Sequence, residues 1–222
     1  MLAKKILNTE FTPLQPDSEI SSALAKMDAW HSSSIPVVEP TTRKVVGHIL
    51  FEDVAGADDE SMPISSLTMR PSLFVFQEQH VFEVARQMLQ HEVRVISVVN
   101  RDEQYVGVVE KKNVLEAFST MLNITTSGSV IIIEMMQSDF TLSELVHLIE
   151  MEGAKILGLT VEQTPDNEMM LQISIKLSHL DTSAVISSLQ RHGYTTTTEN
   201  RFDLLQTDYS NRADELMRYL DV

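Results

Sequence analysis

The sequence predicts a mixed α/β (α+β) protein in which two similar small modules precede a third domain of a different kind. The first observation is an internal repeat: residues 45–53 contain an apolar strand, a glycine, more strand-forming residues and a helix start, and residues 105–113 repeat this order. The second is a small and polar stretch at residues 125–129, after which the order of strands and helices changes. The chain is therefore expected to have two structural parts.

The repeat reads Val45-Val-Gly-His-Ile-Leu-Phe-Glu-Asp53 in the first copy and Tyr105-Val-Gly-Val-Val-Glu-Lys-Lys-Asn113 in the second. The copies also agree upstream, where Ile35-Pro-Val-Val38 corresponds to Ile96-Ser-Val-Val99 and an apolar stripe of helical spacing precedes each segment. Each copy reads as short strand, helix, strand, strand, helix. A repeat of about 60 residues predicts two modules packed as a pseudo-symmetric pair.

We predict the two modules at residues 1–62 and 63–124, a linker at 125–129, the third domain at 130–200 and a helical tail at 201–222. In the first module a strand is expected near Phe11, and Asp17 or Ser18 is expected to cap the helix that follows. In the second module a helix is expected over residues 78–91.

The third domain should begin with a strand over residues 130–136, and Thr141-Leu-Ser-Glu144 has the spacing of a capping box that opens a helix. Residues 169–177 alternate apolar and polar side chains, which predicts a half-exposed antiparallel strand. Together with a strand at 156–161, a second helix and a last strand at 194–198, the order is βαββαβ. This is the ferredoxin-like plan.

The repeated strand and junction residues resemble a tandem pair of CBS (cystathionine-β-synthase) domains over about residues 1–122, and the third domain resembles an ACT domain. This arrangement is similar to that of acetoin-utilisation protein B and its relatives. The resemblance implies a non-catalytic regulatory protein, linked to acetoin or central carbon metabolism, that senses an adenosine-containing molecule such as AMP, ADP, ATP or S-adenosylmethionine. It also implies a homodimer and a regulated protein partner.

In the CBS family the junction after the glycine usually has Thr or Ser, which contacts phosphate, and then Asp, which accepts hydrogen bonds from the ribose diol. This chain has Leu50 and Glu110 at the hydroxyl position, and Asn113 replaces the second Asp. Because Glu110 would repel a phosphate, the copy with Asp53 is the better candidate site. The other reading is that Asp53 only caps the following helix. The resemblance implies these nucleotide-binding residues: Ile35, Pro36, Val37, Gly47 and Asp53 in the first copy, and Arg94, Val95, Ile96 and Asn113 in the second.

The ACT resemblance implies an amino-acid-like ligand at Ser138, Asp139 and Gly153, because a glycine in the left-handed conformation leaves backbone N–H groups free to meet a carboxylate. The alternative is that Gly153 only ends a helix. In the predicted tail an apolar stripe must be covered by its own domain or by a second subunit. The stripe consists of Tyr209, Ala213, Leu216, Met217 and Leu220.

Composition argues against several other classes of protein. The net charge of −15, with few adjacent Lys or Arg residues, argues against nucleic-acid binding. The absence of a signal peptide and of a long apolar run predicts a cytoplasmic protein without a membrane span. Catalytic motifs and metal-ligand spacings are also missing, so no catalytic residue, metal or cofactor is expected. Two alternatives stay open: a protein-interaction module that binds no nucleotide, and an enzyme whose active site carries no motif.

Overall fold

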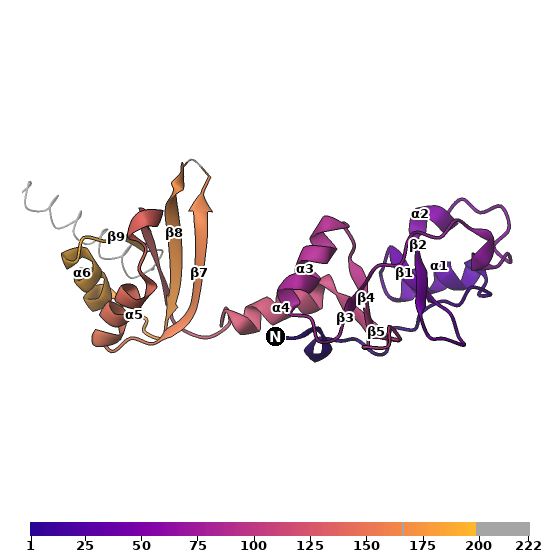
Figure 1. The fold of residues 1–222 in the computed structure, drawn as a ribbon, viewed down its shortest axis with the longest axis horizontal. Helices are drawn as coiled ribbons and strands as arrows, with labels where there is room; N and C mark the ends of the chain where they lie inside the picture. The colour runs from indigo at the N-terminus through magenta and orange to yellow at the C-terminus, as the bar shows by residue number, and fades with distance from the viewer. Residues whose placement is uncertain (166, 199–222) are drawn as a thin grey trace, which may run out of the picture. The chain divides into compact units, whose positions relative to one another are not determined.

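The computed structural model describes residues 1–165 and 167–198 of the chain. It divides the chain into two compact units, Met1–Phe118 and Ser119–Val222. Helices and sheets are present in both units (Figure 1), so the protein is of the mixed α+β class, as predicted. The predicted tail at residues 201–222, with its apolar stripe, lies outside the described residues.

The first unit contains both copies of the repeat, apart from the last three residues of the final helix. The first copy consists of α1 (Ile20–Ala29), β1 (Ser34–Val38), β2 (Val45–Leu50) and α2 (Phe51–Val54). The second copy consists of β3 (Phe74–Phe76), α3 (Val81–Gln90), β4 (Val95–Val99), β5 (Tyr105–Glu110) and α4 (Lys111–Met121). Short 3₁₀ turns, η1 (Ala3–Lys5) and η2 (Ile64–Ser66), precede the copies.

The backbones of the two copies agree in detail. In each copy two strands pair antiparallel, β1 with β2 and β4 with β5, and the register shifts before the last residue pair. Non-glycine residues with positive φ also come in pairs at corresponding places: His31 (47°) with Glu92 (53°), and Arg43 (59°) with Glu103 (60°). The repeat in the sequence is therefore a repeat of backbone conformation.

The strand predicted near Phe11 does not form. Phe11 is buried, but this segment is irregular and meets β1 only through an isolated parallel bridge between Leu14 and Val37. Pro13 and Pro16 flank that bridge, and proline has no N–H to donate to a sheet. The second copy has a regular strand here, because β3 pairs parallel with β4 over three residues.

Two predicted helix starts are also wrong. Helix α1 begins at Ile20 without a side-chain cap, and the Ser18 hydroxyl instead accepts a hydrogen bond from the Gln15 N–H at 3.0 Å. Helix α3 begins at Val81, where the His80 side chain accepts from the Phe82 N–H. The apolar stripes identified the helices correctly, but their polar flanking residues did not fix the ends.

The segment that precedes each copy crosses to the other copy and contacts it there. The N-terminus lies beside the second copy (Figure 1), where the Ala3 N–H donates to the Gln79 carbonyl at 2.9 Å. Further along, Asn8 forms an antiparallel bridge with Val108 of β5. The segment before β3 does the reverse, because Arg70 forms the same kind of bridge with His48 of β2.

Gly47 and Gly107 allow these crossing segments to approach the strands. A Cβ at Gly47 would lie 2.7 Å from the Arg70 carbonyl oxygen, and one at Gly107 would lie 2.6 Å from the Asn8 carbonyl oxygen. Real Cβ atoms do not come this close to backbone oxygen, so the repeated glycine is explained by backbone packing.

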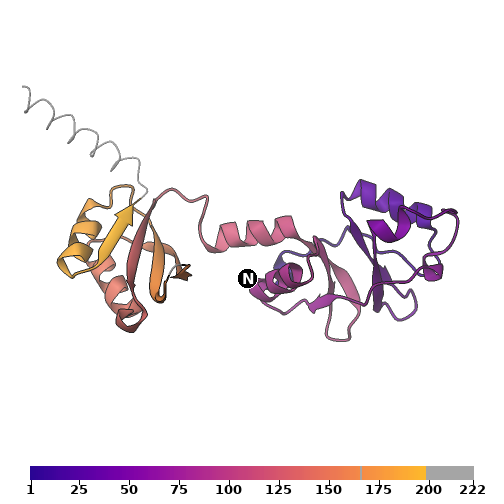
Figure 2. The same cartoon turned by 90° about the horizontal axis from the view of Figure 1, so that it is seen from above.

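The second unit has the predicted βαββαβ order. Its elements are β6 (Ser129–Met136), the turn η3 (Gln137–Asp139), α5 (Leu142–Met151), β7 (Ile156–Thr164), β8 (Asn167–Leu177), α6 (Ser183–Arg191) and β9 (Thr195–Thr198). The antiparallel sheet has the order β7-β8-β6-β9, and α5 and α6 lie together on one side of it (Figures 1 and 2). This is the ferredoxin-like arrangement.

The core of the second unit lies between this sheet and the two helices. Residues 171, 173, 175 and 177 of β8 are buried and the residues between them are partly exposed, which confirms the predicted half-exposed strand. Thr141 precedes α5, but its side chain makes no capping hydrogen bond, so the predicted capping box is wrong.

Candidate functional site

Asp53 holds the junction between β2 and α2. Its Oδ2 accepts the backbone N–H of Leu50 at 3.0 Å, which satisfies one of the donors that a helix start leaves free. The capping role is therefore confirmed, although Asp53 acts from inside the first turn of the helix. The carboxylate remains 17% exposed, and its two oxygens together offer about four lone-pair positions.

Asn113 does the same in the second copy. Its Oδ1 accepts the backbone N–H of Glu110 at 3.2 Å, so the cap is kept while the negative charge is lost. The Glu110 side chain accepts a hydrogen bond from Asn8 Nδ2 at 2.9 Å and forms an ion pair with Lys112 at 3.2 Å. Its charge is thus already engaged by neighbouring polar groups.

Arg70 comes from the crossing segment and lies beside Asp53. Its Nη2 is 2.9 Å from Glu52 Oε1 and 3.2 Å from Asp53 Oδ1, and its Nε is 3.5 Å from Asp53 Oδ2. The hydrogen bond and the charge of Asp53 raise the pKa of the Arg70 guanidinium. Arg70 was not predicted as a site residue, because nothing local in the sequence shows that its segment returns to the first copy.

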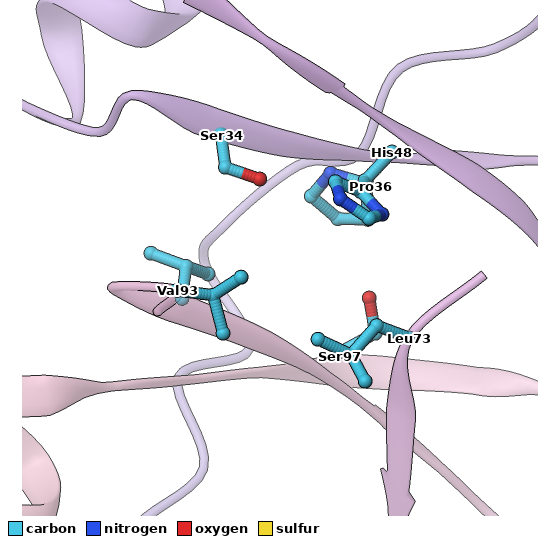
Figure 3. Close-up of a pocket in the computed structure, with 7 residues that line it drawn as sticks. Ser34, Pro36, His48, Leu73, Val93 and Ser97 are labelled. Atoms are coloured by element: carbon cyan, nitrogen blue, oxygen red, sulfur yellow. The ribbon is translucent and has the colours of Figure 1, made fainter. Parts of the chain in front are cut away.

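A narrow cavity lies between the sheets of the two copies. Its volume is about 10 Å³, which is room for roughly one water molecule. Figure 3 shows His48 and the Ser34 hydroxyl on one wall, with Val93 and Ser97 on the opposite wall. The lining residues are Ser34, Pro36 and His48 from the first copy, and Leu73, Val93, Val95 and Ser97 from the second.

His48 is the titratable residue of this cavity. Burial lowers the pKa of its imidazole, and a hydrogen bond with the backbone of Pro71 opposes that effect. The charge of Arg70 lowers the pKa further, Asp53 raises it, and His91 lowers it slightly. With its pKa below the ordinary value near 6.5, the ring is neutral at pH 7.

The other predicted nucleotide-binding residues are distributed over the cavity, the core and the surface. Pro36 and Val95 line the cavity, Gly47 contacts the Arg70 backbone, and Arg94 is exposed at the start of β4. Three residues have side chains buried in the core: Ile35, Val37 and Ile96. Besides Arg70, five residues that line the cavity were not predicted: Ser34, His48, Leu73, Val93 and Ser97.

In the second unit the predicted ligand residues lie at two ends of one helix. The Ser138 hydroxyl donates to Asp139 Oδ1 at 2.9 Å in the turn before α5. Gly153 follows α5 with φ of 77°, so it takes the left-handed conformation expected at a helix end. Helix α5 has ten residues and spans about 15 Å, which separates Gly153 from the other two within one chain.

Residues 1–165 and 167–198 lack two features, a cluster of metal ligands and a membrane-spanning helix. No group of three or more His, Cys, Asp or Glu side chains is placed to hold a metal ion in this part of the chain. Over the same residues, no helix has the length and hydrophobicity needed to cross a membrane.

Comparisons with known proteins identify part of the first unit. The CBS domain family matches residues 64–120, which correspond to the second copy. No curated protein matches the chain.

Several solved structures resemble the chain over about half its length. The CBS domains of a transcriptional regulator from Streptococcus pneumoniae show 24% identity and a TM-score of 0.48, and cover 52% of this chain and 98% of that one. A CBS domain pair/ACT domain protein from Thermotoga maritima shows 20% identity and a TM-score of 0.49, covering 53% and 96%. CBSX2, solved in complex with AMP, shows 19% identity and a TM-score of 0.46, covering 53% and 95%. The chain is thus a mixed α+β protein in which residues 64–120 match the CBS domain family.

Proposed function

We propose that residues 1–124 form a CBS pair that binds an adenosine-containing ligand beside Asp53, and that the protein is regulatory rather than catalytic. The family match to the second copy supports the pair, because the first copy repeats its backbone conformation. The observation that carries the proposal is the position of Asp53. Its partly exposed carboxylate lies beside Arg70 and acts on the His48 imidazole of the cavity.

A ribose diol can replace Arg70 as the partner of Asp53. Hydrogen bonds from hydroxyl groups to a carboxylate contribute roughly 1.5–3 kcal/mol each, whereas exposed ion pairs are individually weak. The bond from Leu50 N–H uses Oδ2, so Oδ1 and a second lone pair of Oδ2 can take the two ribose hydroxyls. Ligand binding would then release the Arg70 guanidinium while leaving the helix cap in place.

The pair of Asp53 and Arg70 can support regulation, because the two residues belong to different copies of the repeat. Asp53 belongs to the first copy, and Arg70 is in the segment that leads into the second. A ligand that changes this contact favours one arrangement of the copies by the difference between its affinities for the two arrangements. A protein partner would recognise the arrangement of the copies that the ligand favours.

The test is calorimetric and thermal-shift titration with AMP, ADP, ATP, adenosine and S-adenosylmethionine, using the natural chain and Asp53→Asn. Asn113 shows that asparagine can make the same cap, so the variant removes the charge while keeping the junction. A ligand at one hundred times its Kd should stabilise the natural protein by about 2.7 kcal/mol. The proposal predicts that Asp53→Asn loses most of this effect. Equal stabilisation of both proteins would place the ligand elsewhere.

A second candidate is a protein-interaction module that binds no nucleotide. It is favoured by the small cavity of about 10 Å³ and by the existing contacts of both Asp53 oxygens, with Leu50 N–H and Arg70. Leu50 also lacks the hydroxyl that would contact a phosphate. If none of the five ligands stabilises the protein, this candidate replaces the first.

We further propose that the second unit is an ACT-like domain that pairs with a second copy and binds an amino acid or a related metabolite, with a link to acetoin or central carbon metabolism. Its βαββαβ order and sheet order support the domain assignment. The separation of Gly153 from Ser138 and Asp139 supports a site completed by a second chain. Light scattering with and without amino acids tests this proposal, since a protein that stays monomeric under all conditions would contradict it.

A further inference from the structure

A second and larger pocket lies near the turn between β1 and β2 in the first unit. Its volume is about 390 Å³, and pockets for small molecules have volumes of roughly 300–1,000 Å³. The segment that precedes the first copy forms one wall, and the β1–β2 turn and the start of β5 form the rest. It shares no lining residue with the cavity beside His48, and Asp53 follows the opposite end of β2. The pocket is therefore separate from the candidate nucleotide site.

The lining of this pocket combines apolar surface with a single positive charge. Among the described residues that line it, Arg43 is the one with a charge, and none is acidic. The chain as a whole has 32 Asp and Glu residues against 17 Lys and Arg residues, so a wall without a carboxylate is notable here. Half of the lining is apolar: Phe11, Pro13, Val38, Pro40 and Val106. This composition favours a ligand with a negative charge and an apolar body.

Arg43 is fixed against β5 by its backbone and by its side chain. Its carbonyl accepts the Tyr105 N–H at 2.8 Å, and its Nη2 donates to the Tyr105 carbonyl at 3.2 Å. A guanidinium has five N–H groups, so this bond leaves others to donate to a ligand. A ligand would meet a cation whose position is already set, which lowers the entropic cost of binding.

The charge of Arg43 is not neutralised by a neighbouring carboxylate. Within residues 1–165 and 167–198, no Asp or Glu forms an ion pair with it. Glu103, the corresponding residue of the second copy, has the same left-handed backbone and pairs with Lys44 at 2.9 Å. The repeat thus keeps the turn and reverses the charge. A ligand carboxylate would complete Arg43, because its two oxygens match the guanidinium fork.

Lys26 places a second positive charge behind one wall of the pocket. Its Nζ donates to the carbonyls of Thr12 and Pro13 at 3.2 and 2.8 Å and to the Thr12 hydroxyl at 3.1 Å. These bonds use the three N–H groups of the ammonium. Lys26 therefore holds the wall in place and favours an anion through its charge, while Arg43 supplies the hydrogen bonds.

We propose that this pocket binds a small organic carboxylate, with the carboxylate on Arg43 and the apolar body on Phe11, Pro13 and Val38. A phosphate group has three acceptor oxygens and a larger charge, for which a single guanidinium supplies few donors. The carboxylate site goes beyond the proposed function, because it needs no nucleotide and no residue of the Asp53 junction.

Trp30 makes binding measurable. It is the single tryptophan of the chain, and its ring centroid lies 5.0 Å from that of the pocket residue Phe11. The probe is hexanoate, compared with uncharged hexanamide and with acetate, which lacks the apolar body. We expect hexanoate to change the Trp30 fluorescence saturably and to bind at least about tenfold more tightly than either. Saturation-transfer NMR detects any binding that leaves the fluorescence unchanged. No binding of hexanoate by either method, or equal affinity for hexanamide, would overturn the inference, and so would tighter binding of inorganic phosphate.

Arg43→Gln removes the charge while keeping an amide that can donate to the Tyr105 carbonyl. It should weaken hexanoate binding at least about tenfold and leave hexanamide binding nearly unchanged. Arg101→Gln is the matched control, because it makes the same change in net charge at a side chain that is 85% exposed and lies outside the pocket. Equal weakening by both variants would mean that hexanoate responds to net charge alone, which would overturn the inference. If Arg43→Gln does not fold, the ligand series on the natural chain still decides. None of these ligands is a nucleotide, so the result is independent of the AMP titration.

Discussion

The two copies of the repeat have the same backbone and different chemistry. At the junction of strand and helix, Asp53 and Asn113 make the same hydrogen bond to the backbone three residues earlier. Around it, the first copy has Arg70 paired with two carboxylates, whereas the second has Asn8 and Lys112 engaging Glu110. The comparison teaches that both copies keep the hydrogen bond of the junction, and that only the first copy makes it with a carboxylate.

The two copies also differ at the position that lines the cavity in the first copy. His48 of the first copy corresponds to Val108 of the second, and both lie opposite a residue of the crossing segment. Val108 is buried as an ordinary apolar residue, while the buried Nδ1 of His48 has no hydrogen-bond partner. A polar residue kept at a position where its repeat mate is apolar indicates a functional difference between the copies.

The largest effects on stability should come from replacing the glycine that occurs at the same place in both copies. Replacing Gly47 or Gly107 by alanine forces a Cβ into a backbone oxygen, and we expect each change to destabilise the protein by roughly 1–3 kcal/mol. Gly107→Ala should cost more, because Gly107 also has a φ of 151°. Urea unfolding measures both. Gly56→Ala is the control, since a Cβ there meets nothing within 4 Å, and equal stability losses at all three positions would refute the steric account.

An intermediate effect on stability should distinguish the capping hydrogen bond of Asp53 from the charge of its carboxylate. Asp53→Ala and Asn113→Ala each remove the acceptor for a helix-start N–H, which we expect to cost about 1 kcal/mol in each copy. Asp53→Asn keeps the acceptor and should be close to neutral for stability. Thermal unfolding of the three variants checks this. If Asp53→Asn were as destabilising as Asp53→Ala, the ion pair with Arg70 would matter for folding, and the carboxylate would not be available for a ligand.

Much of this comparison could be predicted from the sequence. The repeat, the order of elements in the second unit and the exchange of Asp53 for Asn113 all depend on local patterns, and local patterns are what a single sequence records. The same is true of Gly153, whose role as a helix end follows from residue type and position.

The crossing segments could not be predicted. Asn8 and Arg70 each pair with a strand of the other copy, and pairing between segments distant along the chain leaves no periodic signal in either one. Gly47 was predicted to bind nucleotide for this reason, although its immediate contact is the backbone of Arg70. His48 was missed because a single histidine within a strand does not show which face it occupies or whether its ring has partners.

The smallest effect should be a pH dependence of stability. It is caused by His48 in the first copy, and the corresponding Val108 of the second copy cannot titrate. Burial lowers the pKa of His48 below the ordinary value near 6.5 that applies to the unfolded chain. Between those two pKa values the unfolded state binds more protons, so stability is fully present above about pH 6.5 and is lost as the pH falls towards the folded-state pKa.

The charged groups that act on His48 do not reverse this direction, since Arg70 and His91 oppose protonation together with burial, while Asp53 and the Pro71 hydrogen bond favour it. Urea unfolding at pH 7.5 and pH 5.5 measures the loss for the natural chain. His48→Val should lose less stability over the same interval, because its remaining pH dependence comes only from the other titrating groups. An identical loss in both proteins would mean that His48 protonates as readily when folded as when unfolded, and burial would then not lower the pKa of its imidazole.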